Sequence, residues 1–400
     1  MKRNFIIISS PIILILSIIF IGIPVYRNYQ IKNAVVKIEL KSNLNTEFLT
    51  KVKVSDFIAN INGKIIDDYQ IDTTIIGEKI IYFDYINEDN IKLRKSYTIN
   101  ITDNTAPVIW LGNSYSVAVG SKINLLDKIM CGDNYDNNPK CEIIGNYNIN
   151  EVGVYPLTFK ATDQSGNTNE QKFNLNVYKP VSSSNNNTKN YPKTEFKDII
   201  KNYQNANTEI GIDISEWQGD VDFEALKAAG VQFVIIRVGG TKGIGGEYFL
   251  DKKFIQNITN ANKYGIPAGI YFYSYANSET AAIADAKWIL KQIKGYKIDL
   301  PIAFDWENWS FYNDFKLSFF GLTNMANKFL DVFRDAGYDG MLYSSKSYLE
   351  DIWLNTDYPI WLAHYTNKTT YSGKYSYWQM CSDGKVDGII GDVDINIRYK

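Results

Sequence analysis

The first segment of the chain is a long apolar run that carries no charge. Phe5 to Tyr26 are dominated by Ile and Leu, and basic residues stand on both sides. About 20 apolar residues suffice to cross a bilayer, whereas a signal-peptide core has roughly 7–15. The run predicts a transmembrane signal anchor over residues 1–29, with the rest of the chain outside a cell membrane. The alternative is a cleaved signal peptide and a secreted protein.

Short alternating strands separated by turns occupy residues 30–179, and they occur twice. Gly77 and Phe83 in the first copy correspond to Gly153 and Phe159 in the second, since 153 − 77 and 159 − 83 both equal 76. Each copy has a glycine turn, an alternating strand, a polar hairpin and a final alternating strand. The repeat predicts two all-β sandwiches, module 1 over residues 30–105 and module 2 over residues 106–179.

The pattern changes after module 2. Residues 180–192 read PVSSSNNNTKNYP, a polar segment without periodicity, and they predict a linker over residues 180–205. From residue 206 to residue 400, eight short apolar strands follow one another, with helical patterns between at least the first five. This alternation predicts an α/β fold for the C-terminal domain, a parallel β/α barrel of the TIM-like class.

Composition excludes several classes of function. The formal net charge is −2, so no general basic field is available to a nucleic acid. The one histidine, His364, excludes a multi-histidine metal site, and we expect it to be packed within its apolar run. Three cysteines without a CxxC pair exclude a zinc ribbon. Cys131 and Cys141 flank a turn-rich loop and are a disulfide candidate in an exported chain, with two free thiols as the alternative. Cys381 is then left as a small core residue.

Carboxylates are the remaining candidates for chemistry. Asp305 and Glu307 end an apolar strand two positions apart, so their side chains point to one face. Asp213 and Asp394 stand at the ends of the first and last predicted strands, which are neighbours in a closed barrel. Apolar surroundings and like charge raise a carboxyl pKa, which suits the pair to glycoside hydrolysis, where one acid stays protonated and one carboxylate stays charged. The alternative for the pair is two solvated acids at a strand end.

Six motifs resemble one known family. GIDISEWQG, the strand-end DWE, YSS at residues 343–345, PIWLAHY, YWQM and DVDINI follow the order found in lysozymes of glycoside hydrolase family 25. The resemblance spans residues 210–398, and it implies a flattened, incomplete β/α barrel. It also implies cleavage of the β-1,4 bond between N-acetylmuramic acid and N-acetylglucosamine in peptidoglycan. Modules 1 and 2 resemble the bacterial immunoglobulin-like modules of surface proteins.

The resemblance also implies residue roles. Glu307 matches the general acid, and Asp305 matches the carboxylate that stabilises the oxocarbenium-like state or orients the substrate's acetamido group. Asp213 and Asp394 match two further acids of the family's cleft. One departure is His364, where family members often have Arg or Gln. Family analogy favours attack by the acetamido oxygen with net retention of configuration.

Aromatic side chains are candidates for stacking on sugar rings, although core packing explains each one equally well. They are Trp217, Tyr271, Tyr273, Trp306, Tyr343 and Trp378. The expected partners are peptidoglycan glycan strands and, through the N-terminal helix, a membrane. We expect no cofactor, no metal and a monomeric protein.

Two functions follow from these observations. The first is a cell-wall hydrolase, an N-acetylmuramidase. The second is a non-catalytic, surface-anchored peptidoglycan-binding protein that keeps the barrel as a glycan grip. The presence of all four acids favours the first. Modules 1 and 2 show no clustered acids at strand ends, and we expect them to act as a reach element.

Overall fold

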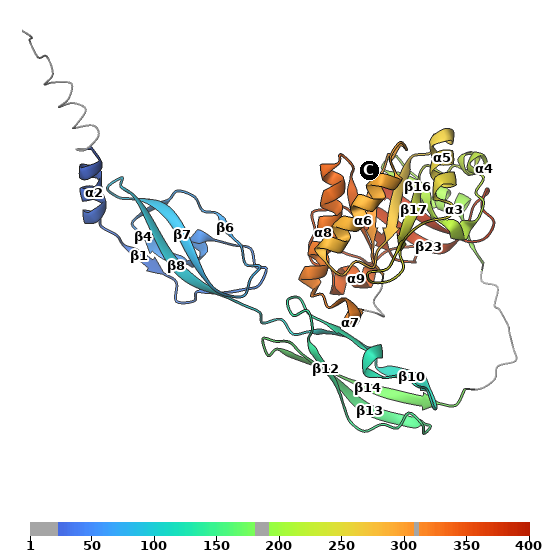
Figure 1. The fold of residues 1–400 in the computed structure, drawn as a ribbon, viewed down its shortest axis with the longest axis horizontal. Helices are drawn as coiled ribbons and strands as arrows, with labels where there is room; N and C mark the ends of the chain where they lie inside the picture. Colours follow the sequence, from blue (N-terminus) through green and yellow to red (C-terminus); the bar gives the residue numbers. More distant parts are fainter. Residues whose placement is uncertain (1–22, 181–191, 308–311) are drawn as a thin grey trace, which may run out of the picture. The chain divides into compact units, whose positions relative to one another are not determined.

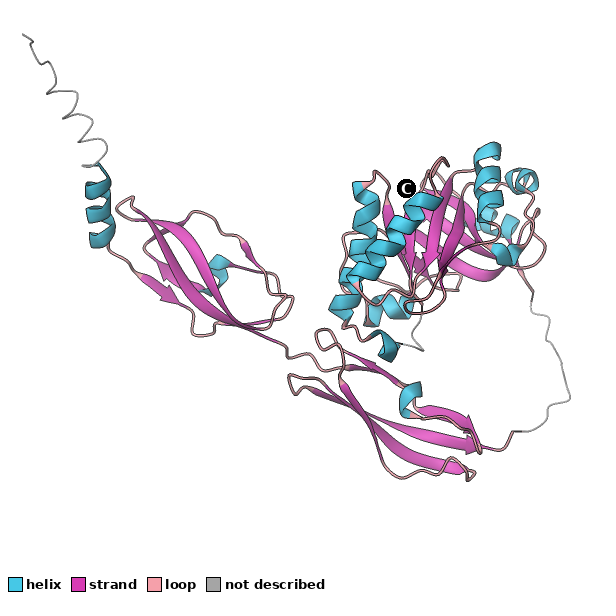
Figure 2. Ribbon diagram, viewed as in Figure 1, coloured by secondary structure: helices cyan, strands magenta, loops and turns pink. Residues whose placement is uncertain are grey.

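The computed structural model of this chain describes residues 23–180, 192–307 and 312–400. Contacts within the chain divide it into two compact units, residues 1–104 and 105–400. Strands build modules 1 and 2, and the larger helices belong to the C-terminal domain, residues 192–400 (Figure 2). Of the predicted linker, residues 181–191 lie outside the described ranges, whereas residues 192–205 include the short strand β15, Thr194–Glu195, and helix α3, Phe196–Tyr203.

The transmembrane part of the expected fold class is corrected. Within the described residues, no helix has the length and apolar character needed to cross a membrane. Residues 23–29, the described end of the predicted anchor, belong to helix α2, Ile23–Asn33, which includes Arg27 and Lys32. The remainder of that anchor, residues 1–22, lies outside the described residues.

Module 1 is built on a four-stranded sheet in the order β2-β8-β7-β5. Two small sheets, β1–β4 and β3–β6, accompany it, and Phe83 and Ile99 lie in its core. Its strands are β1 Ile38–Leu40, β2 Asn45–Glu47, β3 Val52–Lys53, β4 Ile58–Ile61, β5 Gly63–Ile65, β6 Gln70–Ile71, β7 Gly77–Asn87 and β8 Lys92–Thr102, with the 3-10 helix η2 Val54–Phe57.

Module 2 has a second four-stranded sheet of the same kind, in the order β10-β14-β13-β12. In both modules the first strand of this sheet pairs in parallel with the last long strand, β2 with β8 and β10 with β14. The repeat seen in the sequence therefore has a structural counterpart. Its strands are β9 Val108–Trp110, β10 Ser114–Ala118, β11 Met130–Gly132, β12 Lys140–Ile144, β13 Gly153–Thr162 and β14 Thr168–Tyr178, with the 3-10 helix η3 Leu126–Lys128.

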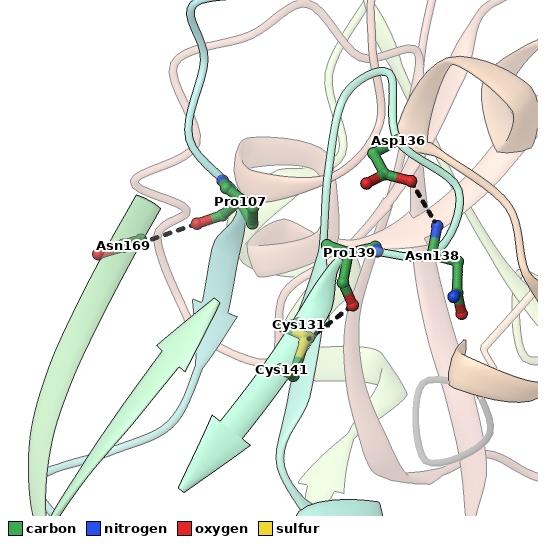
Figure 3. The surroundings of a disulfide bond; sticks show 7 residues. All are labelled: Pro107, Cys131, Asp136, Asn138, Pro139, Cys141 and Asn169. Carbon is green, nitrogen blue, oxygen red and sulfur yellow. Dashed lines mark hydrogen bonds between the residues drawn. A yellow bond between two sulfur atoms is a disulfide. The ribbon is translucent and has the colours of Figure 1, made fainter. Parts of the chain in front are cut away.

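A disulfide joins Cys131 of β11 to Cys141 of β12, so the candidate pair is bonded (Figure 3). Strand β11 pairs only with β9, whereas β12 belongs to the four-stranded sheet. The bond therefore connects the two sheets of module 2 across the turn-rich loop. Cys381, the third cysteine, is buried and free in the C-terminal domain.

Removing this bond is expected to destabilise module 2. Its cysteines are 10 positions apart, and closing a loop of that size is worth about 2–3 kcal/mol of unfolded-state entropy. The double variant Cys131→Ser, Cys141→Ser should therefore unfold at lower guanidinium concentration than the wild type. Adding a reductant should lower the wild-type midpoint and leave the variant's midpoint unchanged. Equal midpoints for both proteins under oxidising conditions would contradict this.

The C-terminal domain is organised around a closed β-barrel. Seven strands run parallel in the order β16-β17-β19-β20-β21-β22-β23, and β24 closes the ring by pairing with both β23 and β16. Two short strands extend it at β17 and β23. The strands are β15 Thr194–Glu195, β16 Thr208–Ile214, β17 Val234–Thr241, β18 Tyr248–Leu250, β19 Ala268–Tyr273, β20 Ile302–Asp305, β21 Gly340–Ser345, β22 Ile360–Ala363, β23 Tyr377–Lys385 and β24 Val393–Tyr399.

The TIM-like α/β barrel expected from the sequence is therefore corrected as well. Strand β24 is antiparallel to both of its neighbours, and no helix stands between β22 and β23 or between β23 and β24. A parallel crossover needs about a dozen residues or more, usually including a helix. Residues 386–392, which join β23 to β24, are too few, so the chain turns back on itself.

Helix α3 precedes the barrel strands, and the other helices that cover the barrel follow strands β16 to β21, where the chain has room for them. Helices α6 and α8 lie side by side along it (Figure 1). The helices are α3 Phe196–Tyr203, α4 Phe223–Ala228, α5 Phe254–Tyr264, α6 Glu279–Gln292, α7 Tyr312–Phe315, α8 Phe319–Asp335 and α9 Lys346–Asp351, with the 3-10 helix η4 Glu216–Gln218.

Two cores result from the alternation of side chains along the strands. Phe233, Met341 and Trp361 belong to a small cluster inside the barrel. Ile236, Phe304 and Leu342 belong to a large cluster between the barrel and its helices. A polar residue at an inward position near a strand's C-terminal end must therefore face the barrel mouth.

Candidate active site

A cleft opens at the barrel mouth, and carboxylates dominate its lining. All four predicted acids meet there, although they come from three strands that are far apart in the sequence. Aromatic and amide side chains complete the wall. The lining residues are Asp213, Tyr271, Asp305, Glu307, Tyr343, Trp361, Tyr365, Gln379 and Asp394.

Asp305 and Glu307 form a coupled pair at the end of β20. Asp305 is buried, and its carboxyl hydrogen-bonds with that of Glu307, which stands at the exposed side of the cleft. Burial, and then the charge of Glu307, raise the pKa of Asp305 well above its usual range. The Glu307 side chain reaches solvent, but the protein around it desolvates the carboxyl and raises its pKa, whereas the hydrogen bond with Asp305 lowers it. Because the two groups titrate together, the pair retains a proton at higher pH than isolated carboxyls do.

Asp213 is held from the opposite side of the cleft by two amides. Its Oδ2 atom accepts hydrogen bonds from Gln379 Nε2 at 2.9 Å and from Asn396 Nδ2 at 2.7 Å. Trp361 Nε1 donates to Asn396 Oδ1 at 2.8 Å, which fixes that amide. Tyr343 fixes the other by donating its hydroxyl to Gln379 Oε1 at 2.9 Å. The orientation of Asp213 is therefore determined by β21 to β24 together.

Asp394 is the register partner of Asp213 across strands β16 and β24. Burial, and then the nearby charge of Glu307, raise the pKa of Asp394 to about 6. Burial, and then the charge of Asp394, raise the pKa of Asp213 well above its usual range. The cleft thus concentrates four carboxyls that bind protons more tightly than solvated acids do.

The comparisons with known proteins agree with this geometry. Residues 212–389 match the sequence model of Glycosyl hydrolases family 25. The C-terminal domain is a family 25 glycosyl hydrolase. The match covers β16 to the turn before β24, so Asp213, Asp305 and Glu307 all lie within it.

Similar proteins include two lysozymes. The autolytic lysozyme of Clostridium acetobutylicum is 31% identical over 189 residues, covering 46% of this chain and 54% of that protein. Lysozyme M1 of Streptomyces globisporus is 30% identical over 210 residues, covering 46% of this chain and 66% of that protein. This chain therefore spans between half and two thirds of the length of these relatives.

A solved structure of the modular autolysin LytC from Streptococcus pneumoniae, with a synthetic peptidoglycan ligand, is 30% identical. The match covers 60% of this chain and 56% of the LytC chain, with a TM-score of 0.41. The resemblance of modules 1 and 2 to immunoglobulin-like repeats stays a prediction.

The predicted sugar-contacting residues of the family 25 domain are placed in different ways. Tyr271 and Tyr343 line the cleft. Tyr273 is half-buried and is the register partner of Asp305 on the adjacent strand. Trp217, in η4 just after β16, is 79% exposed, which leaves its ring available to a ligand.

Two predicted sugar contacts, Trp306 and Trp378, are corrected because both rings lie in the core. Trp306 is fully buried against Phe315, with ring centroids 5.1 Å apart. Trp378 is 3% exposed, and its Nε1 donates to the carbonyl oxygen of His364 at 2.8 Å. Strand alternation explains both positions: each tryptophan neighbours a residue that faces the cleft, so its own side chain points outward.

Sequence reasoning missed Arg237, which stands at the end of the apolar run of β17. Its guanidinium Nε donates to Asp251 Oδ2 at 2.7 Å, and Nη2 donates to Glu216 Oε1 at 3.0 Å. Asp251 Oδ2 also accepts from the backbone N–H of Glu216, at 3.0 Å. Arg237 therefore anchors the turn that presents Trp217, and its charge lowers the pKa of Asp305 against the larger effect of burial. The sequence could have indicated this role, because Arg237 is a charged residue within an apolar strand and a buried charge needs a partner.

Gln379, Asn396, Trp361 and Tyr365 were missed as well. Gln379 and Asn396 are polar residues within apolar strands, and they are 4% and 0% exposed. Buried amides in such positions are normally hydrogen-bonded. The local pattern does not reveal that their common partner is Asp213, more than 160 residues away.

A buried carboxyl outside the cleft, Asp285 of α6, supports the site from behind. Its Oδ2 accepts from Ser274 Oγ at 2.8 Å, and the backbone N–H of Ser274 donates to the carbonyl oxygen of Asp305 at 2.8 Å. Tyr248 also hydrogen-bonds to Asp285. Burial raises the pKa of Asp285 to about 6.

The pKa of Asp285 predicts a pH-dependent loss of stability. The folded protein binds this proton more tightly than the unfolded chain, so the contribution is present below about pH 4 and is lost as the pH rises through about 6. Asp285→Asn is neutral throughout and should be more stable than the wild type near pH 7, by up to about 3 kcal/mol. Thermal unfolding at pH 4, 5, 6 and 7 should show the two proteins diverging as the pH rises. Asp335→Asn, at an exposed position of α8, is the control and should run parallel to the wild type.

Proposed function

We propose that this protein is a cell-wall hydrolase, an N-acetylmuramidase of the lysozyme type. Its substrate is the β-1,4 bond between N-acetylmuramic acid and N-acetylglucosamine in peptidoglycan. The observation that carries the proposal is the meeting of Asp305, Glu307, Asp213 and Asp394 in one cleft of a family 25 domain. The two lysozyme relatives support the same reaction class.

In this proposal Glu307 is the general acid. It reaches the exposed side of the cleft, where a glycosidic oxygen can approach, and desolvation raises its pKa, which favours the protonated form that a general acid needs. The proton moves from Glu307 to the leaving-group oxygen as the glycosidic bond breaks. General acid catalysis of this kind contributes about 10²–10⁴ in rate.

Asp305 is the stabilising or orienting carboxylate. It is fixed in the buried wall of the cleft beside Glu307, and it is the anion of the pair whenever their shared proton lies on Glu307. A carboxylate there stabilises positive charge that develops at the sugar ring, or it orients the acetamido group that attacks the anomeric carbon. Asp213 and Asp394 add negative potential on the far side, and Asp213 is preorganised by Gln379 and Asn396.

Product analysis tests the reaction directly. The full chain is incubated with purified peptidoglycan, new reducing ends are reduced with borohydride, and the fragments are analysed by mass spectrometry. The proposal expects new muramic acid ends. New glucosamine ends would overturn the bond specificity. Binding to peptidoglycan without any new ends would instead support the non-catalytic peptidoglycan-binding alternative.

We also propose that the enzyme works outside the cytoplasm. The disulfide between Cys131 and Cys141 supports this, because such bonds persist in oxidising compartments. The proposed substrate lies in the same compartment. Thiol labelling of the chain recovered from intact cells should find Cys131 and Cys141 protected, and labelling of both would contradict the proposal.

A further inference from the structure

Module 2 differs from a simple spacer because one of its sheets has two apolar faces. In the small sheet β9–β11, Ile109 and Cys131 point into the core of module 2. Val108, Trp110 and Met130 point the other way and pack against the core of the family 25 domain. The small sheet β1–β4 of module 1 instead turns Glu39 and Asn60 to solvent. An apolar outer face therefore distinguishes module 2.

Trp110 makes the most specific contact of this face. Its ring lies against Tyr348, with centroids 5.0 Å apart, and its Nε1 donates to Asp351 Oδ2 at 3.0 Å. Both partners belong to α9, the helix that follows β21 and the cleft residue Tyr343. Trp110 is half-buried and its N–H is hydrogen-bonded, and tryptophans of this kind are common anchor residues of interfaces.

A second contact caps the start of α8, the longer of the two helices between β20 and β21. The first N–H groups of a helix have no partner within it. At the start of α8, Phe319 N donates to the carbonyl oxygen of Asp133 at 2.8 Å, and Phe320 N donates to that of Asn134 at 3.2 Å. These carbonyls belong to module 2, so the beginning of α8 is completed by a different part of the chain.

The Trp110 contact lies close to the proposed general acid. Tyr348 is near enough to Glu307 that the acid's charge, after burial, raises the pKa of the tyrosine. Trp306, between Asp305 and Glu307, packs on Phe315 of α7, and α7 contacts β11 of module 2. Module 2 therefore contacts α9, which lies near Glu307, and α7, which packs on Trp306.

We propose that module 2 is part of the catalytic unit and that Trp110 is a positioning residue, which holds α8 and α9 so that Glu307 is correctly placed. This inference rests on the proposed muramidase function for its kinetic consequences. It departs from the expectation that both modules act only as a reach element. The physical reason is that a general acid must be held within a fraction of an ångström of its productive position.

The test compares full-length variants on soluble peptidoglycan fragments. Trp110→Ala should lower kcat roughly ten- to a hundredfold, as expected when a catalytic group is displaced by about 1 Å, with KM changed less than kcat. Trp110→Phe keeps the ring on Tyr348, loses the bond to Asp351, and should recover part of kcat. Asp351→Ala breaks the same bond from the other side and serves if Trp110→Ala folds poorly. Tyr147→Ala, an exposed aromatic of module 2, is the control and should match the wild type.

Hydrogen exchange separates this inference from the proposed function. In Trp110→Ala, the amides of Phe319 and Phe320 should exchange about tenfold faster or more, because their carbonyl partners are released. Unchanged exchange and unchanged kcat in folded Trp110→Ala or Asp351→Ala would overturn the inference. The inference would also be overturned if Trp110→Ala and the control Tyr147→Ala had the same kcat. If the wild type proves inactive, the proposed function fails, and exchange at α8 alone decides whether module 2 holds this helix.

Discussion

Glu307→Gln is expected to leave the family 25 domain folded and to lower peptidoglycan turnover by about 10²–10⁴. The amide has the same shape as the carboxyl but cannot donate the catalytic proton. Turnover is measured as the release of new reducing ends from purified peptidoglycan. Glu224→Gln, at an exposed position of α4, is the matched control and should keep wild-type activity.

The same variant has a second consequence for its neighbour. The charge of Glu307 is one cause of the raised pKa of Asp305. Removing that charge should lower the pKa of Asp305, and any residual activity should persist to lower pH than in the wild type. If Glu307→Gln keeps more than a tenth of wild-type activity, Glu307 is not the general acid.

Arg237→Gln is expected to destabilise the family 25 domain by about 3–5 kcal/mol, the usual cost of leaving one buried charge without its partner. The side chain of Asp251 is 0% exposed and that of Arg237 is 12% exposed, so water cannot replace the lost ion pair. Arg237→Lys keeps the charge but not the planar fork that bridges Asp251 and Glu216, and it should lie in between. Chemical unfolding of the full chain measures the effect.

The control for Arg237 is Arg334→Gln. Arg334 pairs with Asp331 on the surface of α8, with 62% of its side chain exposed, so its loss should cost only about 0–1 kcal/mol. If both variants lose a similar free energy of unfolding, the buried ion pair of Arg237 stabilises the protein no more than a surface pair does. Arg237→Gln should also weaken turnover, because the released turn carries Trp217 at the edge of the cleft.

Local sequence pattern determined the elements of this protein well. Each of the eight strands expected between residues 206 and 400 appears in the barrel. The two-residue spacing of Asp305 and Glu307 already placed both carboxyls on one face, because the period of a strand is two. The same rule placed Trp306 on the opposite face, although its aromatic character suggested a sugar contact.

Only the tertiary structure decided how these elements combine. The pairing of Asp213 with Gln379 and Asn396 depends on closure of the barrel by β24, whose direction follows from the short connection after β23. The partners of Arg237 and Trp110 likewise come from segments that no local period relates to them. Periodicity reports which face of an element is buried, because burial acts on neighbouring residues. It does not report what covers that face, because the partner is chosen by packing between segments far apart in the chain.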